Sequence, residues 1–184
     1  ICDQNDALLI CDEVQCGMGR TGTLWAYEPS GIAPDLIAAA KPLGGGLPIG
    51  AALAADKVAA LMEPGDHGST FAANALICAV ALAVLGTINE PSFLASIQAK
   101  GHYLGESLSG LLEKRDTVTA IRGRGLMWGI ETTLFTKDIL PAGYEAGLLL
   151  GSSGDHVVRL LPPYIAAEKD MDKAVAMLDQ ILAK

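Results

Sequence analysis

A single lysine, Lys41, stands inside a run of apolar residues and glycines from Asp35 to Ala55, DLIAAAKPLGGGLPIGAALAA. Lysine is among the residues least often buried, so an amine in such a run needs an explanation. Apolar surroundings penalise the charged ammonium and favour the neutral amine, which is a nucleophile and forms Schiff bases with carbonyl compounds. The alternative is a lysine at a strand end whose ammonium simply reaches solvent.

Three glycines, Gly44 to Gly46, follow this lysine closely. Because glycine has no Cβ, the backbone there can approach a ligand or another segment at short range. A reactive amine beside a tight turn suits the chemistry of pyridoxal 5′-phosphate (PLP), which is held through its aldehyde by a lysine. The lysine segment therefore predicts a PLP site.

A PLP site also needs a carboxylate for the ring nitrogen and donors for the phosphate. The segment ALLICDE, residues 7–13, predicts a short buried strand that ends in Asp12 and Glu13, where α/β folds gather ligands. The alternative is a solvated strand end. The segment HGST, residues 67–70, offers hydroxyls and the amides of a following helix to a phosphate. Its serine or threonine could instead be only a helix cap.

Arg159 lies in the apolar segment VVRLL near the end of the chain. A buried arginine there needs an anionic partner, which is either a substrate carboxylate held by two hydrogen bonds or an internal salt bridge. Two further arginines, Arg122 and Arg124 in IRGRG, are interpreted as turn and surface residues.

Two segments resemble motifs of nucleotide-binding proteins, but each motif is incomplete. The segment LLICDE resembles the strand-end acid of a nucleotide hydrolase, yet the chain has no GxxxxGK[ST] loop. The segment GMGRTG, residues 17–22, fits the G-x-G-x-x-G pattern. A dinucleotide site needs a strand directly before this pattern and a helix directly after it, and Thr21-Gly22-Thr23 is a poor helix start. The sequence therefore argues against both nucleotide sites.

The composition limits the class of protein and its partners. The 184 residues are 51% hydrophobic and carry a formal net charge of −8. Nucleic acids and anionic membranes both demand a basic face, so we expect neither as a partner. The four cysteines form no C-x-x-C pair, which predicts free, buried thiols in a reducing cytoplasm. No apolar run reaches membrane length, and residues 72–88 predict a buried helix.

Periodicity predicts a buried α/β part over residues 1–90 and a smaller α+β part over residues 91–184. In the first part we expect strands at 7–13, 35–40 and 49–55. We also expect short helices at 24–27 and 56–62, and a long apolar helix that ends at about residue 89. In the second part we expect helices at 93–114 and 167–184. We expect a pair of strands over 118–132, the end of a helix followed by a strand in 142–152, and a strand at 156–161.

Five segments in this order resemble one known family: LLICDEVQCGMGRTG, PDLIAAAKPLGGGLPIGA, GDHGSTFAAN, IRGRGLMWGIE and VVRLLPP. The chain is similar over nearly its whole length to the class III aminotransferases of PLP fold type I. The resemblance implies an α/β fold. Residues 1–90 would be the C-terminal part of the large PLP-binding domain, with a mostly parallel sheet and helices, and residues 91–184 a small α+β domain.

The resemblance assigns cofactor-binding roles to residues around the first two motifs. Lys41 matches the Schiff-base lysine, which also moves the proton during catalysis. Asp12 matches the partner of the pyridine nitrogen, and Glu13 beside it is grouped with the cofactor-binding residues. Val14 matches the residue that packs on the ring, and Gln15 matches the one that contacts its phenolic oxygen.

The resemblance also implies substrates and a partner subunit. Thr70 matches a threonine that reaches the phosphate of the neighbouring subunit's cofactor, which implies a homodimer with the site at the interface. Ser69 matches a substrate-contacting position, and Arg159 matches the arginine that binds a substrate α-carboxylate. The implied reaction transfers the terminal amine of N2-acetylornithine, or of a related ω-amino donor, to 2-oxoglutarate in arginine biosynthesis.

The chain departs from the family pattern in two ways. It reads AANA at Ala72 to Ala75, where the family usually has GGNP, so backbone freedom is lost there. Its first residue is not methionine, and the family's N-terminal half, which bears a phosphate loop, a ring-stacking aromatic and a substrate-binding arginine, has no counterpart. The alternative function is therefore a non-catalytic fragment or an association module, whose apolar surface would be an interface.

Overall fold

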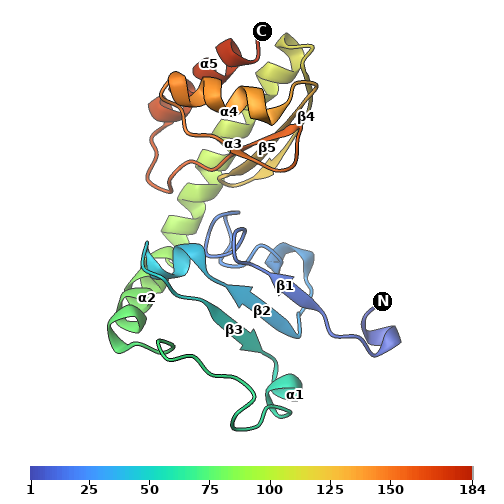
Figure 1. Cartoon of the computed structure of the whole chain (residues 1–184), viewed down its shortest axis with the longest axis vertical. Helices are drawn as coiled ribbons and strands as arrows, with labels where there is room; N and C mark the ends of the chain where they lie inside the picture. The colour runs from blue at the N-terminus through green and yellow to red at the C-terminus, as the bar shows by residue number, and fades with distance from the viewer. Residues whose placement is uncertain (184) are drawn as a thin grey trace. The chain divides into compact units, whose positions relative to one another are not determined.

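The computed structural model describes residues 1–183, which form two compact units, one of Ile1–Leu94 and one from Ala95 onward. Each unit has its own β-sheet (Figure 1). The division falls within a long helix, shortly after the predicted boundary at residue 90.

The first unit contains a three-stranded sheet in the order β1-β2-β3, formed by β1 (Ile10–Asp12), β2 (Leu36–Ala39) and β3 (Ala51–Ala54). All three strands were expected from the sequence, and each is shorter than its apolar segment. β1 and β2 are parallel, whereas β3 is antiparallel to β2. The expectation of a mostly parallel sheet is wrong for this second pair, because residues 40–50 that join β2 to β3 are too few for a crossover connection, which needs about a dozen or more.

The carboxylate of Asp35 fastens the beginning of this sheet. It is buried, its Oδ2 accepts a hydrogen bond from the Leu9 amide at 2.7 Å, and its Oδ1 pairs with Lys57 of α1 (Asp56–Ala59). The bond from Lys57, followed by that from the Leu9 amide, lowers the pKa of Asp35. The segment before β1 is therefore tied to the start of β2 and to the helix after β3.

Three short 3₁₀ helices interrupt the loops: η1 (Asp3–Asn5), η2 (Glu28–Ser30) and η3 (Lys41–Gly44). The helix expected at residues 24–27 is wrong, because that segment forms turns and the helical residues begin at Glu28. Pro29 suits a first helical turn, and Gly31 ends it with φ 65°.

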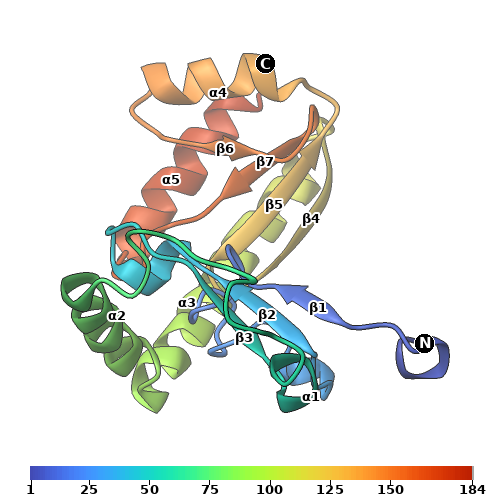
Figure 2. The same cartoon turned by 60° about the horizontal axis from the view of Figure 1, so that its bottom comes forward.

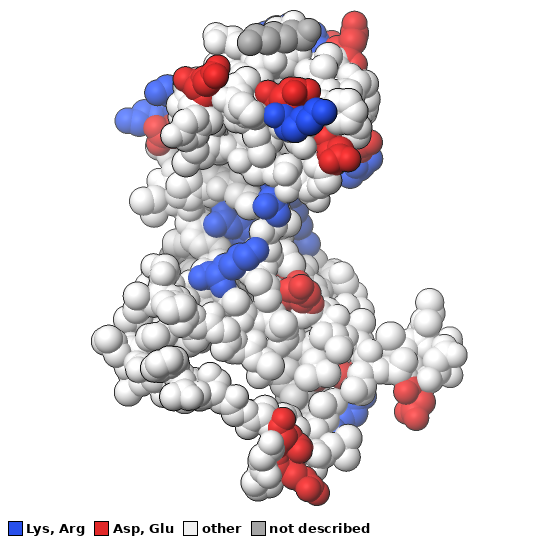
Figure 3. All heavy atoms as spheres, viewed as in Figure 1, with Lys and Arg blue, Asp and Glu red and all other residues white. Residues whose placement is uncertain are grey.

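Helix α2 (Ala75–Ile88) has the expected position but not the expected burial. Only Ala81 and Ile88 are buried, while Leu76 and Leu82 are 71% and 70% exposed. The surface over this helix is free of charged side chains in Figure 3. A helix that is apolar all round is normally buried on all sides, so this surface has the character of an interface.

The second unit is built on helix α3 (Pro91–Lys114), which begins in the first unit. The elements that follow are β4 (Val118–Arg124), β5 (Met127–Thr132), α4 (Thr136–Glu145), β6 (Gly151–Ser152), β7 (Val157–Leu160) and α5 (Glu168–Ile181). The four strands form an antiparallel sheet in the order β4-β5-β7-β6 (Figure 2). The strands and helices predicted for this part are present, although β6 is only two residues long.

One face of this sheet packs on α3 and α5. The Trp128 ring of β5 lies where a Cβ on Gly105 of α3 would stand, at 2.5 Å. The fully buried side chains of this core come from both helices and the sheet: Ile97, Leu104, Leu108, Ile130, Val158, Met171, Leu178 and Leu182. Burial of such side chains contributes about 1.5–3 kcal/mol each.

The C-terminal helix is also held by polar contacts with the end of α3. Asp179 accepts a hydrogen bond from Arg115 Nε at 2.6 Å and pairs with Lys114. The bond from Arg115, followed by that from Lys114, lowers the pKa of Asp179 to about 2. The Thr117 hydroxyl donates a hydrogen bond to the Leu182 carbonyl at 2.9 Å.

Two glycines of α3 offer a matched test of this packing. A Cβ on Gly101 would lie 2.5 Å from the Gly125 Cα and 2.6 Å from its carbonyl oxygen, whereas one on Gly110 would meet nothing within 4 Å. We expect Gly101→Ala to lower the free energy of unfolding by about 1–3 kcal/mol, because backbone must move. Gly110→Ala should raise it by about 1 kcal/mol through helix propensity. Urea unfolding measures both; an equal effect of the two substitutions would contradict the packing described.

Candidate active site

Asp12 and Lys41 lie at the carboxyl ends of the two parallel strands. Asp12 is the last residue of β1 and is paired with Ala38 of β2, while Lys41 follows two residues after β2 ends. The carboxyl ends of parallel strands meet at one edge of a sheet, and ligands of open α/β sheets bind at that edge. The fold therefore places the acid and the amine predicted from the sequence on the same edge.

Lys41 begins η3 in an unusual backbone conformation. Its φ is 34°, and Ala40 before it has φ −160° and ψ −137°. Positive φ is uncommon for a residue with a side chain, and such strain is concentrated at functional sites. The expectation of an apolar pocket around the amine is wrong for this chain, because Lys41 is exposed. The apolar residues before Lys41 form β2, and the lysine lies after the end of this strand, at the open edge of the sheet.

The glycines after Lys41 allow close packing within the chain. A Cβ on Gly44 would lie 2.8 Å from Ile49 Cγ2, and one on Gly45 would lie 2.9 Å from Val84 Cγ2 of α2. Gly45 also has φ 58°, a conformation that favours glycine. The sequence predicted that the backbone at these glycines approaches a ligand or another segment closely. In the structure it approaches other segments of the chain, and the turn that bears Lys41 packs on α2.

The residues after Asp12 are ordered by its own carboxylate. The Val14 amide donates a hydrogen bond to Asp12 Oδ1 at 3.0 Å, and Asp12 is exposed while Val14 and Gln15 are half-buried. This bond fixes Val14 directly beside the acid. It also turns the chain away from the strand, toward the glycine-rich loop.

Glu13 is the anchor of this loop, a role that the sequence motifs did not reveal. Its side chain is 2% exposed, and its oxygens accept hydrogen bonds from the amides of Ala26 at 2.9 Å and Tyr27 at 3.0 Å. Its own amide donates to the Ala38 carbonyl at 2.9 Å, which continues the pairing of β1 with β2. The grouping of Glu13 with the cofactor-binding residues is therefore corrected: its carboxylate is committed to the protein backbone.

Cys16 lies against the Glu13 carboxylate. Its Sγ donates to Glu13 Oε2 at 3.4 Å, and burial, followed by the charge of Glu13, raises the pKa of the thiol to about 11. A thiol with such a pKa is protonated and unreactive at neutral pH. All four cysteines are free and half-buried in the structure, so the expectation of fully buried thiols is wrong.

The GMGRTG segment forms turns, not the start of a helix. Residues 14–27 contain no helix, Met18 is fully buried with φ 54°, and Gly19 and Gly22 have φ 83° and 93°. As expected, no helix directly follows the glycines, so the segment lacks the helix N-terminus that would hold a pyrophosphate.

The serine and threonine of the HGST segment lie on an exposed loop before α2. Ser69 and Thr70 are both exposed, and the helix begins only at Ala75. Asn74 is the N-cap, since its Oδ1 accepts hydrogen bonds from the Leu76 and Ile77 amides at 3.1 and 3.3 Å. The alternative of a serine or threonine cap is therefore wrong. An asparagine before an apolar helical run is the sequence signal for this cap.

Ala73 shows the consequence of the missing glycines in this loop. Its φ is 55°, in the left-handed region where a Cβ is unfavourable by roughly 1–2 kcal/mol. The loop therefore keeps a conformation that suits glycine, although the residue is alanine.

Arg159 belongs to the second unit, on strand β7. It is half-buried and lies opposite Gly129 of β5 on one side and Gly151 of β6 on the other. A Cβ on Gly151 would lie 3.3 Å from Arg159 Nε, so the bare glycine makes room for the guanidinium. Arg122 and Arg124 are exposed as expected, but they lie on β4 and not in a turn.

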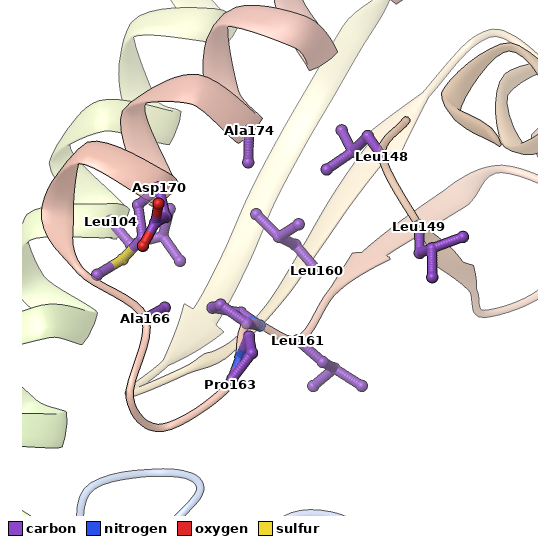
Figure 4. Close-up of a pocket in the computed structure, with 11 residues that line it drawn as sticks. Leu104, Leu148, Leu149, Leu160, Leu161, Pro163, Ala166, Asp170 and Ala174 are labelled. Atoms are coloured by element: carbon purple, nitrogen blue, oxygen red, sulfur yellow. The ribbon is translucent and has the colours of Figure 1, made fainter. Parts of the chain in front are cut away.

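The second unit also has an apolar hollow of about 380 Å³, which contains none of the predicted site residues (Figure 4). It is lined by leucines of α3, β7 and the segment before β6, by the two prolines after β7 and by one face of α5, and Asp170 is its single carboxylate. Asp170 Oδ2 accepts a hydrogen bond from the Ala167 amide at 3.2 Å, as a residue of the first helical turn does. The hollow is therefore mainly apolar, and its one carboxylate takes part in the N-terminal turn of α5.

No three His, Cys, Asp or Glu side chains in residues 1–183 are arranged to hold a metal ion. No single helix there is long and apolar enough to cross a membrane; α2 and α3 meet the length and composition test only together, bent by 66°.

Sequence comparison relates the chain to a family of enzymes. The family described as "Aminotransferase class-III" matches residues 1–182. The chain is 47% identical over 182 residues to the mitochondrial acetylornithine aminotransferase of Alnus glutinosa, covering 98% of this chain and 40% of that protein. It is 45% identical over 185 residues to the acetylornithine aminotransferase of Caldanaerobacter subterraneus, covering 100% of this chain and 47% of that protein.

Solved structures give the same result for the fold. The ornithine delta-aminotransferase of Plasmodium falciparum matches with a TM-score of 0.90 at 33% identity, and the N-acetylornithine aminotransferase of Stenotrophomonas maltophilia with 0.86 at 34%. Each match covers 99% of this chain and 48% of the other.

The fold is thus that of the α/β proteins of PLP fold type I, as expected from the sequence. The chain belongs to the class-III aminotransferase family, whose members depend on PLP. The chain spans about half the length of the curated relatives it matches.

The anchoring role of Glu13 is testable by hydrogen exchange. Glu13→Ala should leave the half-buried amides of Ala26 and Tyr27 without these acceptors and speed their exchange, with a loss of about 1 kcal/mol for each hydrogen bond. The control is Glu28→Ala, because Glu28 is exposed and accepts one bond, from the Trp25 amide at 3.2 Å. Unchanged exchange at both amides in Glu13→Ala would show that the loop does not depend on this carboxylate.

Proposed function

We propose that this chain holds part of the active site of a PLP-dependent aminotransferase. The reaction transfers the terminal amino group of N2-acetylornithine, or of a related ω-amino donor, to 2-oxoglutarate in arginine biosynthesis. The observation that carries the proposal is the placement of Asp12 and Lys41 at the carboxyl ends of adjoining parallel strands. The names of the sequence relatives, acetylornithine aminotransferases, support this choice of donor.

The groups at this edge suit PLP. The hydrogen bond described for Asp12 uses Oδ1, which leaves Oδ2 to accept from a protonated ring nitrogen. The exposed Lys41 amine is accessible to an aldehyde, and its strained backbone holds it at the strand end. When bound, PLP supplies an electron-withdrawing ring that stabilises negative charge on the substrate carbon.

Each residue at the edge then has a defined task. The negative charge of Asp12 keeps the ring nitrogen protonated. Lys41 binds the cofactor through Nζ, and as a free amine it takes a proton from the substrate carbon and returns it. Val14, fixed beside the acid, packs on the ring, and Gln15 donates a hydrogen bond to its phenolic oxygen. Glu13 acts through the loop and positions these residues.

Two residues are proposed to contact the substrate. Arg159 binds a substrate carboxylate with two parallel hydrogen bonds, which a guanidinium supports better than an ammonium. Ser69 contacts the substrate from the loop before α2. We further propose that the first unit is the C-terminal part of the large domain and the second unit the small α+β domain, with the boundary near residue 90.

Trapping of PLP at Lys41 tests this proposal. The chain is incubated with one equivalent of PLP, reduced with borohydride and mapped by peptide mass. We expect one phosphopyridoxyl group on the peptide that contains Lys41, because this amine stands at the strand edge. Lys41→Arg should abolish the adduct, since a guanidinium keeps the charge but does not condense with an aldehyde. Lys169→Arg, at an exposed lysine of α5, is the control. Equal labelling of the Lys41→Arg variant would contradict the assignment.

The proposed assembly is a homodimer with the cofactor site at the subunit interface. Thr70 would reach the phosphate of the neighbouring subunit's cofactor, and its exposed position on the loop before α2 supports this role. The exposed apolar side chains of α2 are the kind that dimer interfaces bury. We propose the cytoplasm as the location, supported by the four free cysteines.

The same helix supports a second candidate function. A chain that spans about half of its relatives and exposes an apolar helix could be an association module without activity of its own. The absence of a PLP adduct at Lys41 in a folded chain that still associates would favour this function over catalysis.

Association through α2 can be measured directly. Leu82→Glu places a charge on the exposed apolar surface of the helix and should lower the molecular mass found by light scattering toward that of a monomer. The matched control is Ile165→Glu, because Ile165 is 87% exposed in the second unit. If both variants keep the mass of the unmodified chain, the interface is not on α2.

A further inference from the structure

The first unit has few buried apolar side chains, although the two units are almost equal in length. Of the apolar side chains buried within residues 1–183, fourteen belong to the second unit and four to the first: Met18, Ala39, Ala81 and Ile88. Large apolar side chains that are exposed show the reverse distribution, with eleven in the first unit and five in the second. The first unit therefore leaves uncovered the kind of surface that the second unit buries in its core.

The central strand of the first unit's sheet shows this most clearly. All four residues of β2 are apolar, yet only Ala39 is buried. A strand that is apolar on both faces is normally covered on both faces. Ile10, which pairs with Leu36 on one face, is 62% exposed. Leu53, which pairs with Ile37 on the other face, is 42% exposed. Both faces of this sheet are therefore incompletely covered.

The sheet also has an open edge at β1 (Figure 1). Within residues 1–183, β2 is the only strand paired with β1. The bonds of a parallel ladder involve alternate residues, and here the Leu9 carbonyl and the Glu13 amide bond to β2. By this alternation the amide and carbonyl of Ile10 point to the open side. Such an edge is a template for pairing with a further strand.

A second copy of the chain would not cover all of this surface. Two identical chains related by a two-fold axis contact each other through one self-complementary patch. Such a patch on α2 suits the proposed homodimer. The two faces of the sheet and the β1 edge need elements on both sides of the sheet, as the layers of an α/β domain provide.

The relatives contain enough additional chain to supply such elements. This chain covers 47% of the acetylornithine aminotransferase of Caldanaerobacter subterraneus, so the part that it does not match is slightly longer than the chain itself. The chain also has the fold of solved aminotransferases over 99% of its length, at a TM-score of 0.90. Its uncovered surface therefore has the shape that it takes in proteins of about twice this length.

We propose that the first unit binds a separate polypeptide that corresponds to the part of the relatives this chain does not match. This partner adds a strand at the β1 edge and covers both faces of the sheet. The inference names the partner for the second candidate function, association, and it does not depend on the proposed catalysis.

Co-expression tests the proposal. The 184-residue chain carries an affinity tag and is produced together with the part of the Caldanaerobacter subterraneus enzyme that it does not match. We expect the two polypeptides to be recovered in equal amounts. Ile10→Glu and Leu53→Glu each place a charge on one face of the sheet, and each should lower the recovery of the partner about tenfold, because the charge would be buried without a counter-ion. The matched control is Leu112→Glu, since Leu112 is 45% exposed in the second unit.

Hydrogen exchange locates the contact. Binding of the partner should slow the exchange of the Ile10 amide, because this amide gains an acceptor at the open edge. The amides of β5 are the internal reference, since β5 is already paired with a strand on each side. They should change less than the Ile10 amide.

Three outcomes would overturn the proposal: no recovery of the partner with the unmodified chain, equal recovery with all three glutamate variants, or an Ile10 amide that is already protected in the 184-residue chain alone. The last outcome would show that a second copy covers the edge. A complex that forms without PLP trapping at Lys41 would refute the proposed catalysis alone; trapping without a complex would refute this inference alone.

Discussion

The parallel pairing of β1 with β2 is the constraint on which the candidate site depends. It brings two residues that are 29 positions apart, Asp12 and Lys41, to one edge of the sheet. The pairing is held at one end by the buried carboxylate of Asp35 and at the other by the bond from the Glu13 amide to Ala38. A slip of one residue would turn Asp12 to the other face of the sheet.

The glycine-rich loop beside this edge is held by one buried polar group, the carboxylate of Glu13. Glu13 accepts hydrogen bonds from two amides at the far end of the glycine-rich loop, and Gly17 is so close that a Cβ there would lie 2.9 Å from Glu13 Oε2. The positive φ of Lys41 and Ala73 shows that the site segments keep unfavourable backbone conformations. Such conformations persist only where the surroundings determine them.

Local patterns predicted the elements well and their surroundings poorly. The strands around Cys11 and Ile37 and the helix after Asn74 were recognised because apolar runs and periodicity are local properties. The exposure of α2 and of Lys41 was not predicted correctly. Burial depends on segments that are distant in the sequence, and the chain spans about half the length of its relatives. The role of Glu13 was hidden because its partners lie 13 and 14 residues away.

The sequence by itself determined the identity of the reactive groups: a lysine in an apolar run, an acid at a strand end and an arginine in an apolar strand, in an order typical of one family. Only the tertiary structure decided their arrangement. It showed that Glu13 serves the backbone and that Asn74, and not a serine or threonine, caps α2. The reason is that the chemical nature of each residue can be read directly from the sequence, whereas strand register and hydrogen-bond partners depend on the pairing of segments far apart in the chain.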